Sequence, residues 1–136
     1  MKYLALVYYQ EQIMNQMSQQ EWDSLNQECM ACGEKLQSTG HMLDGSALQS
    51  VETATTVRVR NGKVTVTDGP FAETKEQLAG FYLLEARDIN EAIQLAGNIP
   101  PVLKFARCVN CRLNRIAVAV KEVHHHDAKT ANLSVV

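Results

Sequence analysis

The segment DGPFAETKE, residues 68 to 76, contains the densest group of side chains in the sequence that could perform chemistry. Asp68 or Glu73 would act as a general acid or base, since a carboxyl group with a shifted pKa can transfer protons near neutral pH. Lys75 would hold an anionic group of a substrate. Loops on rigid scaffolds often carry such sites, so the segment is a candidate wall of a ligand cleft.

The same segment also has a purely structural interpretation. Asp68 can accept backbone hydrogen bonds in a turn, Gly69 tolerates unusual torsions, and Pro70 stiffens the exit. Phe71 would then anchor the loop on the core. In the functional interpretation, Gly69, Pro70 and Phe71 instead line the ligand cleft beside the charged residues.

His41 is a second candidate, because an ordinary histidine titrates near neutral pH. It follows Gly40 at the start of an expected strand, and Asp44 lies three residues further on. Alternation places those two side chains on opposite faces, so they form a dyad only if Gly45 introduces a bulge. The structural alternative is a surface histidine after a helix-capping glycine. The candidate catalytic residues are therefore His41 and Asp68.

Two Cys-x-x-Cys pairs, Cys29/Cys32 and Cys108/Cys111, have the spacing of zinc ligands. The pairs lie about 75 residues apart, whereas compact zinc sites separate them by roughly 15 to 20 residues. The first pair also fits the buried stripe of a helix, where cysteine behaves as a small hydrophobe. The run His-His-His-Asp at 124–127 is interpreted as part of a tail. We therefore predict no metal site and no cofactor.

Composition excludes several classes of function. Hydrophobic residues make up 46% of the chain and charged residues 21%, and the net charge is -2, which provides no general attraction for nucleic acid. No apolar run approaches the roughly 20 residues that span a bilayer, and the N-terminal apolar run is too short for a signal sequence. The basic residues of the hairpin described below lack interleaved aromatics for base stacking. We expect a cytoplasmic protein that binds neither nucleic acid nor membrane.

Strand and helix signals define the elements that position these residues. The run YLALVYY, residues 3 to 9, suits a strand that is buried on both faces. Ser18 and Glu21 form a capping box that begins a helix over about 19–39. The apolar stripe of this helix has steps of three and four residues and consists of Trp22, Leu25, Cys29, Cys32 and Leu36.

Residues 41–48 indicate a short strand, and TTVRVR-NG-KVTVTD indicates a β-hairpin. Asn61 and Gly62 supply the two positive φ angles of a type I′ turn. The resulting register collects four valines on one face of the hairpin, namely Val57, Val59, Val64 and Val66. Arg58, Arg60, Lys63 and Thr65 occupy the other face, which we expect to be solvated.

A strand at 80–86 precedes a helix that begins at Asp88, and Pro100-Pro101 ends that helix. Residues 102–109 supply a last core strand. The expected domain covers residues 1–109, and residues 110–136 form an extension with one extra strand before a disordered tail.

This order of elements is the ferredoxin-like split βαβ pattern of an α+β domain, with the hairpin inserted. Two helices cover only one face of a four-stranded sheet, although two of the strands are apolar on both faces. A second copy of the chain is the simplest cover for the remaining face, so we predict a face-to-face homodimer.

The stretches VTDGPFAETKEQLAGFYLLEA, TTVRVRNGK and GHMLDG resemble the DGPF subgroup of the YCII-related proteins over about residues 1–105. The resemblance implies a dimeric α/β barrel of ferredoxin-like subunits. It also implies a link to extracytoplasmic-function sigma factors in some relatives and lyase activity in one branch. The histidine and aspartate proposed as that family's site correspond to positions near Cys29 and near Gly97–Asn98, where this chain has neither group.

Two functional hypotheses follow. In the first, the protein binds a small molecule in a cleft beside the DGPF segment, with lyase- or isomerase-type acid–base catalysis. In the second, it is a non-catalytic regulatory or interaction module, linked to a sigma factor. The charged segment favours the first hypothesis, and the absent histidine and aspartate favour the second.

Overall fold

The computed structural model describes residues 1–100 and 117–123. Its helices are α1 (Glu11–Met14), α2 (Gln19–Ser38) and α3 (Ile89–Gly97), with a 3₁₀ turn at Val51–Thr53. Its strands are β1 (Lys2–Tyr9), β2 (Met42–Ala47), β3 (Thr55–Arg60), β4 (Lys63–Asp68), β5 (Gln77–Glu85) and β6 (Ala117–Glu122).

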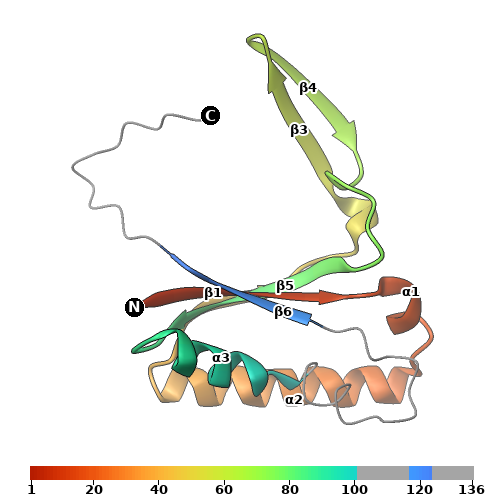
Figure 1. Ribbon diagram of the computed structural model, residues 1–136. Helices are drawn as coiled ribbons and strands as arrows, with labels where there is room; N and C mark the ends of the chain where they lie inside the picture. The colour runs from red at the N-terminus through yellow and green to blue at the C-terminus, as the bar shows by residue number, and fades with distance from the viewer. Residues whose placement is uncertain (101–116, 124–136) are drawn as a thin grey trace.

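The main sheet has four strands in the order β2-β5-β1-β6, and every neighbouring pair is antiparallel. Helices α2 and α3 lie together on one face of this sheet, and the hairpin β3–β4 forms a separate two-stranded sheet (Figure 1). This arrangement confirms the predicted α+β, ferredoxin-like fold with an inserted hairpin. The dimeric barrel stays a prediction.

Both long helices begin at the predicted caps. The Ser18 side chain accepts from the backbone N–H of Glu21, and the Glu21 carboxylate accepts from the backbone N–H of Ser18 at 2.9 Å. Asp88 accepts from the backbone N–H of Glu91 in the same way at the start of α3. At the other end of α2, Gly40 adopts φ +75°, a left-handed conformation that glycine reaches without strain.

The hairpin has the predicted turn and register. Asn61 and Gly62 have φ values of 51° and 72°, as a type I′ turn requires. Val57 pairs with Val66, and Val59 pairs with Val64.

The core lies between the helices and the sheet, in two clusters. The larger cluster joins α2, α3 and the centre of the sheet, and its buried residues are Tyr3, Ala5, Leu36, Leu84, Ala86, Ala92, Ala96 and Ile99. The smaller cluster lies near α1 and contains Met14 and Leu25, with Tyr9, Met17, Trp22 and Cys29 packed against them. All five residues of the predicted helical stripe therefore belong to these clusters or contact them.

Some element boundaries differ from the expectation. Residues 10–17, between the predicted strand at 3–9 and the predicted helix at about 19–39, contain the short helix α1, and β5 begins at Gln77 rather than at residue 80. The predicted strand at 102–109 and the tail at 124–136 lie outside the described residues. Within the predicted extension, β6 is a strand that pairs with β1 at the edge of the main sheet. The domain boundary at residue 109 stays a prediction.

Candidate functional site

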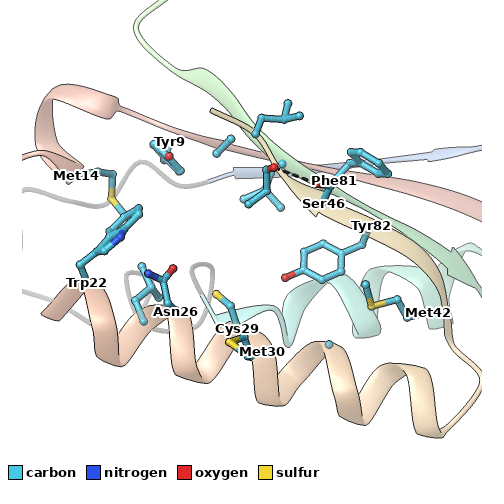
Figure 2. Close-up of a pocket in the computed structure, with 18 residues that line it drawn as sticks. Tyr9, Met14, Trp22, Asn26, Cys29, Met30, Met42, Ser46, Phe81 and Tyr82 are labelled. Atoms are coloured by element: carbon cyan, nitrogen blue, oxygen red, sulfur yellow. Dashed lines mark hydrogen bonds between the residues drawn. The ribbon is translucent and has the colours of Figure 1, made fainter. Parts of the chain in front are cut away.

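A cavity of about 640 Å³ lies between α2 and the strands β2, β5 and β1, and we call it the α2 cavity. Figure 2 shows Trp22 and Met14 at one end, Tyr82 and Met42 at the other, and Cys29 and Met30 on α2 between them. The volume falls within the range of small-molecule sites, roughly 300 to 1,000 Å³. Its walls are mainly apolar, as in most such sites.

Small residues on the strands create this cavity. Strands β2 and β5 approach so closely that a Cβ on Gly80 would lie 2.7 Å from the carbonyl oxygen of Ser46. A Cβ on Gly45 would lie 2.7 Å from Cε of Met42 and 3.0 Å from the carbonyl oxygen of Phe81. A side chain at Gly80 would therefore have to move the backbone of β2, and one at Gly45 would have to displace Met42. Neither glycine provides a side chain to fill the space beneath α2.

Helix α2, which faces these strands, also has a residue without a side chain where it borders the cavity. Gly33 lies inside α2 and lines the cavity, and a Cβ there would meet only Sδ of Met42, at 3.8 Å. An interior helical glycine costs about 1 kcal/mol relative to alanine. The space for a methyl group exists, so sterics do not require glycine at residue 33.

The remaining walls are aromatic rings and methionines. Tyr9 and Trp22 border one end, and the Tyr82 ring points from β5 toward α2 (Figure 2). The ring of Phe81 lies on the far side of the sheet from α2, although this residue also borders the cavity. Methionine side chains adapt to ligands of irregular shape, and aromatic faces stack on flat rings.

Few polar groups face the cavity, and burial raises the pKa of its two tyrosine hydroxyls, those of Tyr9 and Tyr82. Burial raises the pKa of the Tyr82 hydroxyl to about 12, with further contributions from Cys29 and Cys32. Burial also raises the pKa of the Cys32 thiol, which lies next to the cavity, and Lys35 only partly opposes this shift. Tyr82 and Asn26 can therefore donate hydrogen bonds to a ligand. The described lining residues include no histidine, lysine, arginine or carboxylate, so the commonest general bases are absent from the described lining.

The start of the DGPF segment stabilises the base of the hairpin. The backbone N–H of Gly69 donates to the carbonyl of Ala54 at 2.7 Å, and the Thr56 hydroxyl donates to the carbonyl of Gly69 at 2.8 Å. Gly69 has φ +98°, which explains the preference for glycine. Asp68 is the last residue of β4 and pairs with Thr55.

Phe71 does not anchor the loop on the core, as the structural interpretation expected. Its side chain is exposed, and the Arg58 guanidinium lies 5.3 Å from the ring centroid. Arg58 also donates to the carbonyl of Phe71 at 3.3 Å. The polar face of the hairpin is therefore not wholly solvated, because this arginine holds the DGPF segment. Pro70, which precedes Phe71, is half-buried.

Glu73 and Lys75 line a separate, polar hollow of about 500 Å³. The other lining residues described are Gln10, Gln12, Thr74 and Gln77. This hollow is the structural counterpart of the cleft that the sequence predicted beside the DGPF segment. Asp68, Gly69, Pro70 and Phe71 are not among its lining residues.

His41 lies far from that hollow within one chain. Its Nδ1 is 3.0 Å from the carbonyl oxygen of Glu85, at the end of β5, whereas the DGPF segment leads into Gln77 at the start. Nine strand residues span roughly 25 to 30 Å, so His41 and Asp68 do not form one site in a single subunit. A register shift does occur between Met42 and Asp44, but the Asp44 carboxylate accepts from the backbone N–H of Gly45.

No group of three or more metal-ligating side chains occurs within residues 1–100 and 117–123. Cys29 and Cys32 lie on α2. The pair Cys108/Cys111 and the histidines at 124–126 lie outside the described residues. In the described part of the chain, no helix combines the length and apolarity needed to cross a membrane.

Sequence reasoning missed the α2 cavity as a site, although it identified several of the residues around it. The helical stripe that includes Trp22 and Cys29 was interpreted as core, which is its commonest role. The signal that could have revealed a cavity is the set of glycines Gly33, Gly45 and Gly80. These glycines fall on facing elements only after the fold has been assembled.

The chain is similar in sequence to known proteins over most of its length. The family model of the YCII-related domain matches residues 1–107. An uncharacterized protein of Rhizobium meliloti (strain 1021) is 34% identical over 99 residues, which cover 73% of this chain and 80% of that protein. The matched region contains both long helices, the hairpin, β1, β2 and β5, and with them the α2 cavity. The chain therefore belongs to the YCII-related family.

Proposed function

We propose that this protein binds a small, largely apolar molecule with an aromatic ring in the α2 cavity. The observation that carries the proposal is a volume of about 640 Å³ between aromatic and methionine side chains. Flat rings would stack against Trp22 or Tyr82, and one polar substituent would accept a hydrogen bond from Asn26 or Tyr82. Burial of apolar ligand surface would supply most of the affinity.

Binding without acid–base catalysis is the better-supported form of this function. A general base must lie within hydrogen-bond reach of its proton and have a pKa near the working pH. The described lining residues of the cavity include no histidine, lysine or carboxylate, and burial moves the pKa of Tyr82 to about 12, away from neutrality. These properties support the hypothesis of a ligand-binding regulatory module over that of a lyase or isomerase.

The single tryptophan of the chain provides the test. Trp22 lines the cavity, so a ligand that stacks there should change its fluorescence. We expect 2-naphthol, a flat probe with one hydroxyl group, to quench Trp22 emission in a saturable titration. A linear response with no saturation up to millimolar probe would contradict the proposal.

Gly33→Leu is the matching variant, because Gly33 lines the cavity from the C-terminal half of α2 and its added side chain would enter that space. Ala31→Leu adds the same side chain to an exposed position of the same helix and is the control. Binding should fall at least tenfold in Gly33→Leu and stay within about twofold in Ala31→Leu. Equal affinities in both variants would place the probe elsewhere.

The polar hollow beside the DGPF segment is a second candidate site. Lys75 and Glu73 line it with three glutamines, which suits a small anionic or amide-containing molecule rather than an apolar one. If this protein performs the acid–base catalysis considered in the sequence analysis, this hollow is where Glu73 and Lys75 would take part. Titration with a panel of small carboxylates, followed by the chemical shifts of the Gln10 and Gln77 side-chain amides, tests it. Shifts that persist in Lys75→Gln would contradict the role of the lysine.

We also propose that two copies associate through the face of the main sheet that α2 and α3 leave uncovered. Leu4 pairs with Leu83 and Leu6 pairs with Phe81, and alternation places all four on that face. Burial of this apolar face would favour association. A native mass spectrum should therefore show twice the 15.2 kDa mass of the chain. A monomer at micromolar concentration would contradict the dimer.

A further inference from the structure

The hairpin arm, defined as Thr55–Asp68, projects from the body of the protein. Strands β3 and β4 pair with each other and with no strand of the main sheet in the described part of the chain. Figure 1 shows the arm rising from one end of the main sheet, on the side away from α2 and α3. A two-stranded hairpin without packing against another layer is marginally stable in water, so this arm needs a partner surface.

One face of the arm is a patch of exposed valines, which we call the valine face. Val57, Val59, Val64 and Val66 are 60%, 66%, 59% and 61% exposed. The register places Val57 beside Val66 and Val59 beside Val64, so the four side chains form one contiguous square. Exposed apolar patches that involve several neighbouring residues mark interaction surfaces, whereas single exposed hydrophobic residues are ordinary.

The opposite face of the arm is already in use within the chain. Arg58 lies over the Phe71 ring and donates to the hydroxyl of Thr67 and to the carbonyl of Phe71. Thr56 is buried and donates to the carbonyl of Gly69. The DGPF segment therefore occupies the polar face of the arm. The valine face is the one that stays available.

We propose that the valine face packs on a second copy of this chain and that the arm clasps the partner subunit. This inference rests on the proposed face-to-face homodimer. Two sheets that pack face to face lie about 10 Å apart, whereas the six residues of β3 span roughly 20 Å. An arm of this length on the uncovered side of one sheet is long enough to reach past the sheet of the partner. A two-fold axis then gives each subunit one arm and one surface that receives an arm.

The area of the valine face supports a copy of the chain as the occupant. Full burial of an aliphatic side chain stabilises by roughly 1.5 to 3 kcal/mol, which at roughly 25 cal/mol per Å² corresponds to a buried area of roughly 60 to 120 Å². Four valines that are about 60% exposed therefore offer on the order of 200 Å² per arm. Stable interfaces bury roughly 800 Å² per partner. Each subunit would bury its own valine face and the surface that receives the partner's arm, together on the order of 400 Å², so the uncovered sheet face must supply about as much again.

The test compares two aspartate substitutions on neighbouring residues of β4. Val64→Asp places a charge on the valine face, and Thr65→Asp places the same charge on the polar face, opposite Arg58. Sedimentation equilibrium then gives the dimer dissociation constant of each variant and of the wild type. We expect Val64→Asp to raise that constant at least 100-fold, and Thr65→Asp to change it by less than threefold.

Hydrogen exchange of the arm amides gives a second readout that does not depend on the variants. Protection in the wild type should rise with protein concentration through the dimer dissociation constant. Circular dichroism checks that both variants keep the main fold, and Val59→Thr provides a milder change on the same face.

Three outcomes would overturn the proposal. A wild-type dimer that Val64→Asp leaves intact would refute the clasp while the sheet-to-sheet dimer stands. A monomeric wild type would refute both proposals. Arm amides that are equally protected at all concentrations would show that the valine face is covered by something other than a second copy.

Discussion

Gly80→Ala provides the sharpest test of the close approach between β2 and β5. A Cβ at this position would lie 2.7 Å from the carbonyl oxygen of Ser46, whereas ordinary van der Waals contact begins at 3.4 Å. The difference, 3.4 minus 2.7, is 0.7 Å, so β2 must move by about that distance. The obstacle is backbone of the neighbouring strand and cannot rotate away.

The expected cost follows from the hydrogen bonds between the two strands. A shift of about 0.7 Å stretches neighbouring N–H···O bonds beyond useful length, and losing two of them costs about 2 to 3 kcal/mol. Replacing glycine also lowers the conformational entropy of the unfolded chain, which stabilises the folded state by about 0.4 to 1 kcal/mol. The net destabilisation is about 1 to 2.5 kcal/mol, within the usual range for overpacking.

Urea unfolding at one fixed protein concentration measures this cost, with Gly33→Ala as the control. At an m-value of about 2 kcal/mol per M, the midpoint of Gly80→Ala should fall by roughly 0.5 to 1.2 M. Gly33→Ala should instead raise the midpoint, because its methyl group meets only Sδ of Met42 at 3.8 Å and alanine favours the helix by about 1 kcal/mol. An unchanged midpoint for Gly80→Ala would refute the close approach on which our explanation of the α2 cavity rests.

Two further predictions concern the helix cap and the hairpin arm. The pKa of Asp88 is lowered first by the hydrogen bond from the backbone N–H of Glu91 and then by the neighbouring Arg87. The ionised Asp88 carboxylate therefore stabilises the folded protein at pH values above the ordinary aspartate pKa. This stabilisation is lost as the pH falls through the lowered pKa of the folded state. The difference in melting temperature between wild type and Asp88→Asn, followed from pH 6 to about pH 2.5, should therefore shrink at low pH, and a constant difference would contradict this linkage. Phe71→Ala removes the ring beneath Arg58 and with it a cation–π interaction of about 0.5 to 1 kcal/mol. Amide hydrogen exchange in Thr55–Asp68 should therefore accelerate roughly two- to fivefold, without a change in the main melting transition. Phe71→Tyr keeps the ring and is its control, and equal exchange in both variants would contradict a role for the ring.

Local chemistry made much of the fold predictable. The capping box at Ser18, the N-cap at Asp88 and the turn at Asn61-Gly62 each involve residues three or fewer positions apart, and all three are present. The hairpin register followed from the alternation of valines and from the turn type. Such signals are complete within a few residues of sequence, so they need no knowledge of the rest of the chain.

The site was less predictable because it depends on distant residues meeting. His41 and Asp68 were both candidate catalytic residues, but His41 lies at the end of β5, whereas the DGPF segment leads into its start. Phe71 contacts an arginine that lies 13 residues away, and the exposed ring would have been expected inside the core from its apolar character alone. The α2 cavity arises from glycines on three different elements, and no local pattern records that they face one another.

The strand order of the main sheet also has a consequence for the time course of folding. Among the described strands, β1 is synthesised first, yet it is an inner strand of the sheet, and its partners are residues 77–85 and 117–122. The hairpin arm can close as soon as residue 68 has emerged, but β1 has no strand to pair with until about residue 85 is available. Its apolar run YLALVYY is therefore exposed through most of synthesis, when it is open to pairing with other nascent chains. Closing so long a loop is the step that should limit the refolding rate of the purified chain.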